Sequence, residues 1–198
     1  MLTQVPAGQP RLRCGRHAAF LAAAILGIAL ARLSGTQAPI ALAFACYGAL
    51  HAAIVALSLR PGPAPRRTLA FVVAAAILSG SLARLGLLAA PLLAGGGVEA
   101  AALRIVAVSA FAGALGYGVL LRCLLRHRLA PGLLVMIAFA CVFAACAALA
   151  LMRQYPIVGS AWLAILWWLA FSGGLCADAG RHARLARVPR DAPRQRIP

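Results

Sequence analysis

Six long apolar stretches follow one another along the 198-residue chain, separated by short polar segments. A helix needs about 20 mostly apolar residues to cross the hydrocarbon core of a bilayer. Each stretch is close to this length, and together they cover residues 17–33, 40–59, 69–93, 100–121, 129–152 and 157–177. The pattern predicts an all-α integral membrane protein with six transmembrane helices.

The composition supports this fold class and excludes a soluble domain. Hydrophobic residues make up 64% of the chain and charged residues only 11%, which leaves too little polar surface for a water-soluble protein. A net charge of +16 would indicate nucleic-acid binding in a soluble protein. Here the charge lies in short loops and tails, where it meets anionic lipid headgroups. We therefore expect membrane lipids, and no nucleic acid, as partners.

The basic residues fall mainly in alternate segments of the chain, all on one side of the predicted bundle. Of the 19 arginines, 15 fall in segments 1–16, 60–67, 122–128 and 181–196. Cytoplasmic segments of membrane proteins carry this excess of positive charge. The sequence therefore predicts a multi-pass protein of the bacterial inner membrane with both termini in the cytoplasm. It divides into a basic segment 1–16, a transmembrane domain 17–177 and a basic tail 178–198.

Short external links predict how the helices pair. The links at 34–39, 94–99 and 153–156 are too short to separate the helices that they join, which favours three antiparallel hairpins. Segment 25–39 also aligns with segment 77–91, with eight of 15 positions identical. The match suggests a parallel two-helix internal repeat.

Four arginines break the cytoplasmic bias, and Arg84 is the deepest of them. It lies about 13 Å before the end of its stretch, at about 1.5 Å per residue. A charge at that depth is costly unless it is paired or hydrated, and it is a candidate functional residue. Glu99, the one external carboxylate, could form a structural ion pair with Arg84, Arg104 or Arg32, and we favour the pair with Arg84. The functional alternative is an outward-facing anion site formed by Arg84, Arg32 and Arg104.

Ser79 and Ser81 flank Gly80 near the middle of the third stretch. A helix broken at this point would direct free backbone donors at an anion, which makes both serines candidate ligand-binding residues. Small residues in membrane helices more often allow a neighbouring helix to pack closely. We favour close packing.

His51 is the one histidine in the interior of a predicted span, and it shares a helix face with Tyr47 and Ser58. It could bind a ligand, carry a proton, or ligate haem or a metal. Haem between helices usually takes two axial ligands, and the six cysteines show no metal-ligand spacing. We expect a hydrogen-bonded interior histidine, no metal and no cofactor.

The sequence contains no motif that names a reaction. It lacks an HExxH helix, a GxSxG elbow and a pair of membrane carboxylates, so we do not expect an enzyme. Two function classes remain open. One is a small-solute (anion) carrier, or its membrane subunit, with a site near Arg84. The other is a non-catalytic scaffold or assembly protein that packs against partner membrane subunits or forms a homo-oligomer.

Overall fold

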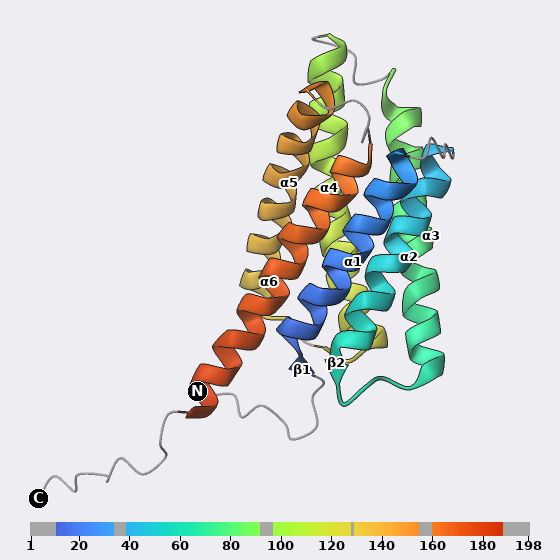
Figure 1. Ribbon diagram of the computed structural model, residues 1–198. Helices are drawn as coiled ribbons and strands as arrows, with labels where there is room; N and C mark the ends of the chain where they lie inside the picture. The colour runs from blue at the N-terminus through green and yellow to red at the C-terminus, as the bar shows by residue number, and fades with distance from the viewer. Residues whose placement is uncertain (1–10, 34–38, 92–96, 128, 155–159, 188–198) are drawn as a thin grey trace, which may run out of the picture.

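The computed structural model describes residues 11–33, 39–91, 97–127, 129–154 and 160–187. These residues form six long helices, each apolar and long enough to cross a membrane (Figure 1). Their bounds are α1 Cys14–Leu33, α2 Ile40–Ser58, α3 Pro65–Ala89, α4 Val98–Leu124, α5 Pro131–Gln154 and α6 Ala161–Arg187. The predicted all-α, multi-pass membrane fold is confirmed.

The helix ends follow local signals in the sequence. Proline is the first residue of both α3 and α5, where its missing N–H is not needed and its fixed φ suits a helix. At the other end of the chain, α6 runs ten residues beyond the predicted limit at 177 and stops at Arg187. The basic tail predicted from residue 178 therefore begins as a continuation of α6.

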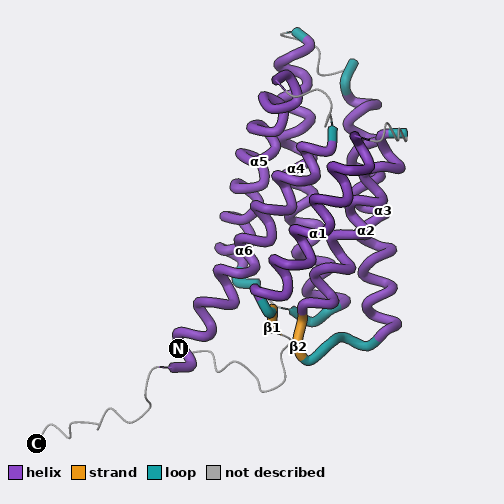
Figure 2. Tube along the Cα trace, in the orientation of Figure 1, coloured by secondary structure: helices purple, strands orange, loops and turns teal. Residues whose placement is uncertain are grey.

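A two-stranded pairing that the sequence did not reveal ties α1 to α2. Strand β1 (Arg11–Leu12) pairs antiparallel with β2 (Leu59–Arg60), so Leu12 lies opposite Leu59. Both leucines are buried, and the backbone N–H of Arg13 donates to the carbonyl of Ser58 at 3.0 Å. This contact fixes the start of α1 against the end of α2 (Figure 2).

Helices that follow one another in the chain pack against one another, and α1 closes the bundle against α6 (Figure 1). The contact between α2 and α3 is the most extensive, although these helices are joined on the side predicted to be cytoplasmic. The packing therefore does not divide the bundle into three separate hairpins. That grouping and the internal repeat stay predictions.

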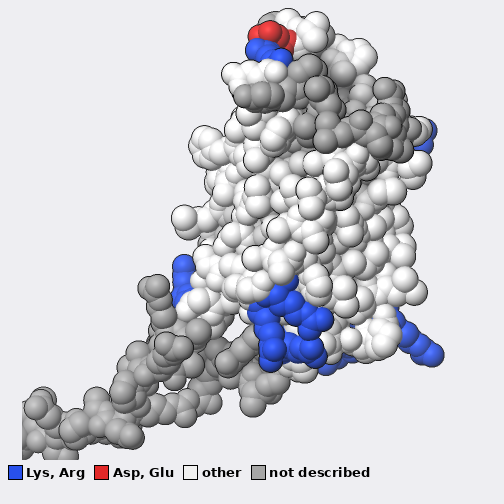
Figure 3. Space-filling view, in the orientation of Figure 1, with Lys and Arg blue, Asp and Glu red and all other residues white. Residues whose placement is uncertain are grey.

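Charged residues gather at the two ends of the bundle. On the face shown in Figure 3, arginines cluster at the end that carries β1 and β2, and the surface between the two ends is uncharged. Large apolar side chains such as Leu69, Ile77 and Phe143 are exposed on the helices. An uncharged, apolar band of this kind is the surface that a bilayer covers.

Glycines allow α2 and α3 to approach closely. A Cβ atom at Gly48 would lie 2.7 Å from the carbonyl oxygen of Ala75, and one at Gly80 would lie 3.2 Å from that of Ala41. Helix association in lipid depends on such packing, because burial from lipid brings no hydrophobic gain. The expected close packing at Gly80 is confirmed. The alternative of a broken helix is wrong, since α3 is continuous through Ser79 and Ser81.

Substituting Gly48 by alanine should destabilise the bundle. The added methyl group meets the backbone of α3, which cannot move away without separating the helices, so we expect a loss of about 1–3 kcal/mol. Gly27→Ala is the matched control, because a Cβ at this α1 position meets no atom within 4 Å. Thermal unfolding of the purified protein measures both. Equal melting temperatures for the two variants would contradict the close approach of α2 and α3.

Candidate ligand cavity and buried histidine cluster

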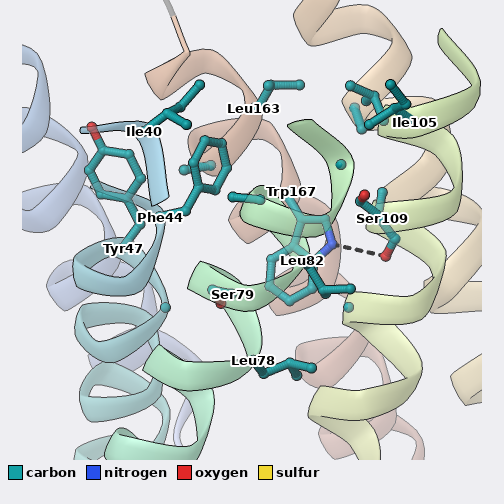
Figure 4. Close-up of a pocket in the computed structure, with 18 of the residues that line it drawn as sticks. Ile40, Phe44, Tyr47, Leu78, Ser79, Leu82, Ile105, Ser109, Leu163 and Trp167 are labelled. Atoms are coloured by element: carbon teal, nitrogen blue, oxygen red, sulfur yellow. Dashed lines mark hydrogen bonds between the residues drawn. The ribbon is translucent and has the colours of Figure 1, made fainter. Parts of the chain in front are cut away.

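A cavity of about 310 Å³ lies between α2, α3, α4 and α6. It extends from Ile40, the first residue of α2, to His51. At about 1.5 Å per residue this is about 16 Å along the helix axis. Figure 4 shows Ile40, Leu163 and Ile105 at one end of this space and Leu78 at the other. The cavity therefore occupies the half of the bundle remote from β1 and β2.

The cavity wall is almost entirely apolar. Among the described residues, no arginine, aspartate or glutamate lines it, and hydroxyl groups come from Tyr47, Ser79, Ser109 and Tyr117. The indole of Trp167 lies between the α2 and α4 sides of the cavity, and its Nε1 donates to the carbonyl of Ala110 at 3.3 Å (Figure 4). Apolar walls with a few hydrogen-bonding groups are typical of small-molecule sites.

His51 lies at the deep end of the cavity and joins three helices. It is fully buried, with its Nδ1 3.1 Å from the hydroxyl of Tyr117 on α4 and its Nε2 3.0 Å from the hydroxyl of Ser172 on α6. Buried polar groups need such partners because water cannot reach them. Both ring nitrogens are thus satisfied inside the bundle.

Aromatic rings pack around His51 and close the bottom of the cavity. Trp168 stacks on the His51 ring at 5.4 Å between centroids, and Trp167 stacks on Phe171 at 5.0 Å. Both tryptophans line the cavity, Trp168 as a buried residue and Trp167 as a partly exposed one. The two adjacent tryptophans of α6 therefore both contribute to the cavity wall.

A second histidine, which was not predicted from the sequence, is buried beside His51. His17 on α1 is 1% exposed, and its ring centroid lies 6.3 Å from that of His51. Because α1 begins at Cys14, His17 lies one turn inside the helix and not at its edge. The prediction that His51 is the one histidine in the interior of a span is therefore wrong. His17 is the first residue of the first apolar stretch, and extending that stretch by one turn to Cys14 would have placed it inside the helix.

The structure separates the residues predicted to form an anion site. Arg84, Arg104 and Ser81 are exposed and do not line the cavity, whereas Ser79 and His51 do. The side chain of Arg32 lies outside the described residues. Ligand binding by Ser79 and His51 stays a prediction, and a cluster of the described arginines at the cavity is not formed.

Glu99 pairs with a different arginine from the one predicted. Its Oε1 lies 3.0 Å from the guanidinium of Arg153, and in the described part of the chain there is no ion pair between Glu99 and Arg84. The packing of α4 against α5 explains the change, since it brings the end of α5 beside the first turn of α4. Both side chains are largely exposed, that of Arg153 at 66% and that of Glu99 at 80%.

The fold and the site together define a six-helix membrane protein with an apolar internal cavity. No protein-family model, curated protein or solved structure matches the chain. Within the described residues, no group of three or more histidine, cysteine or acidic side chains is arranged to hold a metal ion. The cavity and the buried histidines are therefore the features of the molecule that bear on its function.

Substitutions at Glu99 should show which arginine it contacts. An exposed ion pair contributes at most about 1 kcal/mol, so a double-mutant cycle of Glu99→Ala with Arg153→Ala should give a small coupling energy. The same cycle with Arg84→Ala should give a value near zero. Denaturant unfolding measures both cycles. A coupling energy of several kcal/mol between positions 84 and 99 would show that the observed pairing is not the stable one.

Proposed function

We propose that this protein binds a small, uncharged, mainly apolar molecule and acts as its carrier, or as the membrane subunit of a carrier. The observation that supports this most strongly is the cavity of about 310 Å³, which is lined by apolar side chains and a few hydroxyl groups. Cavities of about 300–1,000 Å³ with such walls hold small organic ligands.

The cavity wall favours a neutral solute over an anion. An anion in an apolar cavity needs paired charges or several aligned donors, because its desolvation is otherwise too costly. Arg84 and Arg104 are the described arginines that directly adjoin cavity-lining residues in the sequence, and both are exposed outside the cavity. The long arginine stem lets a guanidinium reach the headgroup region from such a position. This narrows the carrier hypothesis to uncharged molecules.

The orientation in the membrane belongs to the same proposal. The excess of arginine in alternate segments favours both termini in the cytoplasm of a bacterial cell, with the helices grouped as three hairpins. The cavity would then extend towards the external face. A solute would enter from outside or from the outer leaflet.

Reporter fusions test this orientation. Fusions after Gly62 and Arg126 should behave as cytoplasmic, and a fusion at Gly96 as external, because arginine-rich loops resist translocation. An external signal from the 60–67 loop would reverse the proposed orientation.

A scaffold remains the second candidate, and one observation favours it. Gly27 on α1 and Gly173 on α6 are exposed, and a Cβ atom added at either would meet nothing within 4 Å. Exposed small residues leave room for the close approach of a helix from a partner subunit or a second copy. Such a protein would need no solute in its cavity.

Two matched fluorescent probes distinguish these possibilities. N-phenylnaphthylamine is neutral and apolar, and anilinonaphthalene sulfonate carries a sulfonate on the same ring system. We expect saturable binding of the neutral probe, with energy transfer from the tryptophans, of which Trp167 and Trp168 line the cavity. The affinity for the anion should be about tenfold or more weaker. Fluorescence titration of the protein in nanodiscs measures both.

A pair of neighbouring α4 substitutions controls for binding to lipid. Ser109→Phe places a ring in the cavity and should abolish saturable binding of the neutral probe. Val108→Phe places the same ring on the exposed surface, outside the cavity, and should leave binding unchanged. Probe binding that both variants retain would favour the scaffold. Preferential binding of the sulfonate, lost in Arg84→Ala, would restore the anion hypothesis.

A further inference from the structure

Two buried imidazole rings on different helices lie edge to face at the deep end of the cavity, where His51 is part of the cavity wall. His17 on α1 and His51 on α2 are 1% and 0% exposed, and their centroids are 6.3 Å apart at an interplanar angle of 72°. A cavity that only holds an apolar solute needs neither ring. Ionisable residues inside a membrane bundle are costly, and their presence calls for a functional explanation.

The hydrogen bonds of His17 leave one ring nitrogen able to accept a proton. The hydroxyl of Ser58 donates to the carbonyl of Ile54 at 2.6 Å, so its oxygen accepts from Nδ1 of His17 at 3.3 Å. In the neutral ring, Nε2 then carries the lone pair. This nitrogen is buried and has no hydrogen-bond partner among the described residues.

The partners of His51 suit both of its charge states. The hydroxyls of Tyr117 and Ser172 can each donate or accept. A neutral His51 donates to one hydroxyl and accepts from the other. A protonated His51 donates to both, and the hydroxyl that was donating turns to accept. No hydrogen bond is lost when the ring gains a proton.

We propose that His51 and His17 form a proton-binding pair whose protonation opposes occupation of the cavity by a neutral solute. The pair holds one proton in total, because two adjacent buried cations would repel each other. Uptake forms one N–H bond, at the accepting nitrogen of His51 or at Nε2 of His17, and no electrons are transferred. This inference rests on the proposed binding function and adds proton coupling to it.

The surroundings of His51 contain no counter-charge. Tyr117 reaches it from α4 and His17 from α1, while α6 contributes Ser172 and Trp168. Tyr47, one turn earlier on α2, is its titratable neighbour along its own helix. No described carboxylate forms a hydrogen bond or ion pair with His51, so a proton there depends on nearby water for stabilisation.

The surroundings of His17 are also without a paired carboxylate. Cys14 lies one turn earlier on α1, with its Sγ 3.8 Å from the carbonyl of Cys176 on α6. The buried Asp178 on α6 pairs with His182 at 3.6 Å. Arg13 and Arg16 at the start of α1 are exposed cations. A proton on His17 therefore lies between the buried His51 and the arginine-rich end of the bundle.

The position of His51 at the bottom of the cavity supplies the coupling. Water in the cavity polarises around a charged ring and stabilises it over a few ångströms, whereas an apolar solute displaces that water. Solute binding should therefore lower the proton occupancy of the pair. By linkage, protonation must weaken solute binding by the same factor. A carrier with this property exchanges protons for solute.

The pH dependence of probe binding tests the pair. N-phenylnaphthylamine stays uncharged in this range, and its affinity should fall about fivefold or more between about pH 7 and about pH 4. In His17→Gln and His51→Gln the ratio of the two affinities should approach one, because glutamine hydrogen bonds but does not titrate. His127→Gln and His182→Gln, at other histidines, should keep the wild-type ratio.

A second readout needs no variant. Adding the neutral probe to weakly buffered protein at about pH 4.5 should release protons, measured with a pH-sensitive dye. If the probe does not bind, the proposed binding function fails. If it binds with an affinity that is independent of pH and releases no protons, the histidine pair alone is rejected. A pH dependence that survives in both His17→Gln and His51→Gln also rejects it.

Discussion

The hydrogen bonds of His51 to Tyr117 and Ser172 constrain the rest of the bundle. In lipid a polar group finds no water, so it must find its partners inside the protein. These two bonds are made by residues 66 and 121 positions away from His51 in the chain. They fix the rotation of α2, α4 and α6 about their axes. A rotation of any of the three would leave a buried polar group without a partner, at a cost of about 1–3 kcal/mol.

Small residues decide where the bundle is tight and where it is open. Gly48 and Gly80 bring α2 and α3 into close contact. Towards the end of the bundle remote from β1 and β2, the cavity is lined by Ala83 on α3, Ala90 directly after α3 and Ala102 on α4. Short side chains there leave a space that no larger residue fills. Helices α2, α4 and α6, which are joined by the hydrogen bonds of His51, also form part of the cavity wall, together with α3.

Hydrophobic length predicted the six helices to within a few residues at most ends, because spanning a bilayer imposes a strict requirement on each segment. The pairing of helix faces could not be predicted in this way. Helices that are apolar on all sides carry little amphipathic signal to distinguish the interior from the lipid face. The expectation that Glu99 pairs with Arg84 went wrong for this reason, and β1 and the buried position of His17 were missed. Each depends on contacts between distant segments. The burial of His51 was predictable, because a lone histidine in an apolar span has to find partners.

The most direct test of the account is a double-mutant cycle at the histidine cluster. The cycle combines His51→Leu with Tyr117→Phe, and a parallel cycle combines His51→Leu with Ser172→Ala, each measured by denaturant unfolding. The account predicts a favourable coupling of about 0.6 kcal/mol or more for each pair, in the range found for hydrogen bonds between membrane helices. Coupling energies near zero in both cycles would show that His51 does not join α2 to α4 and α6, and would contradict the account.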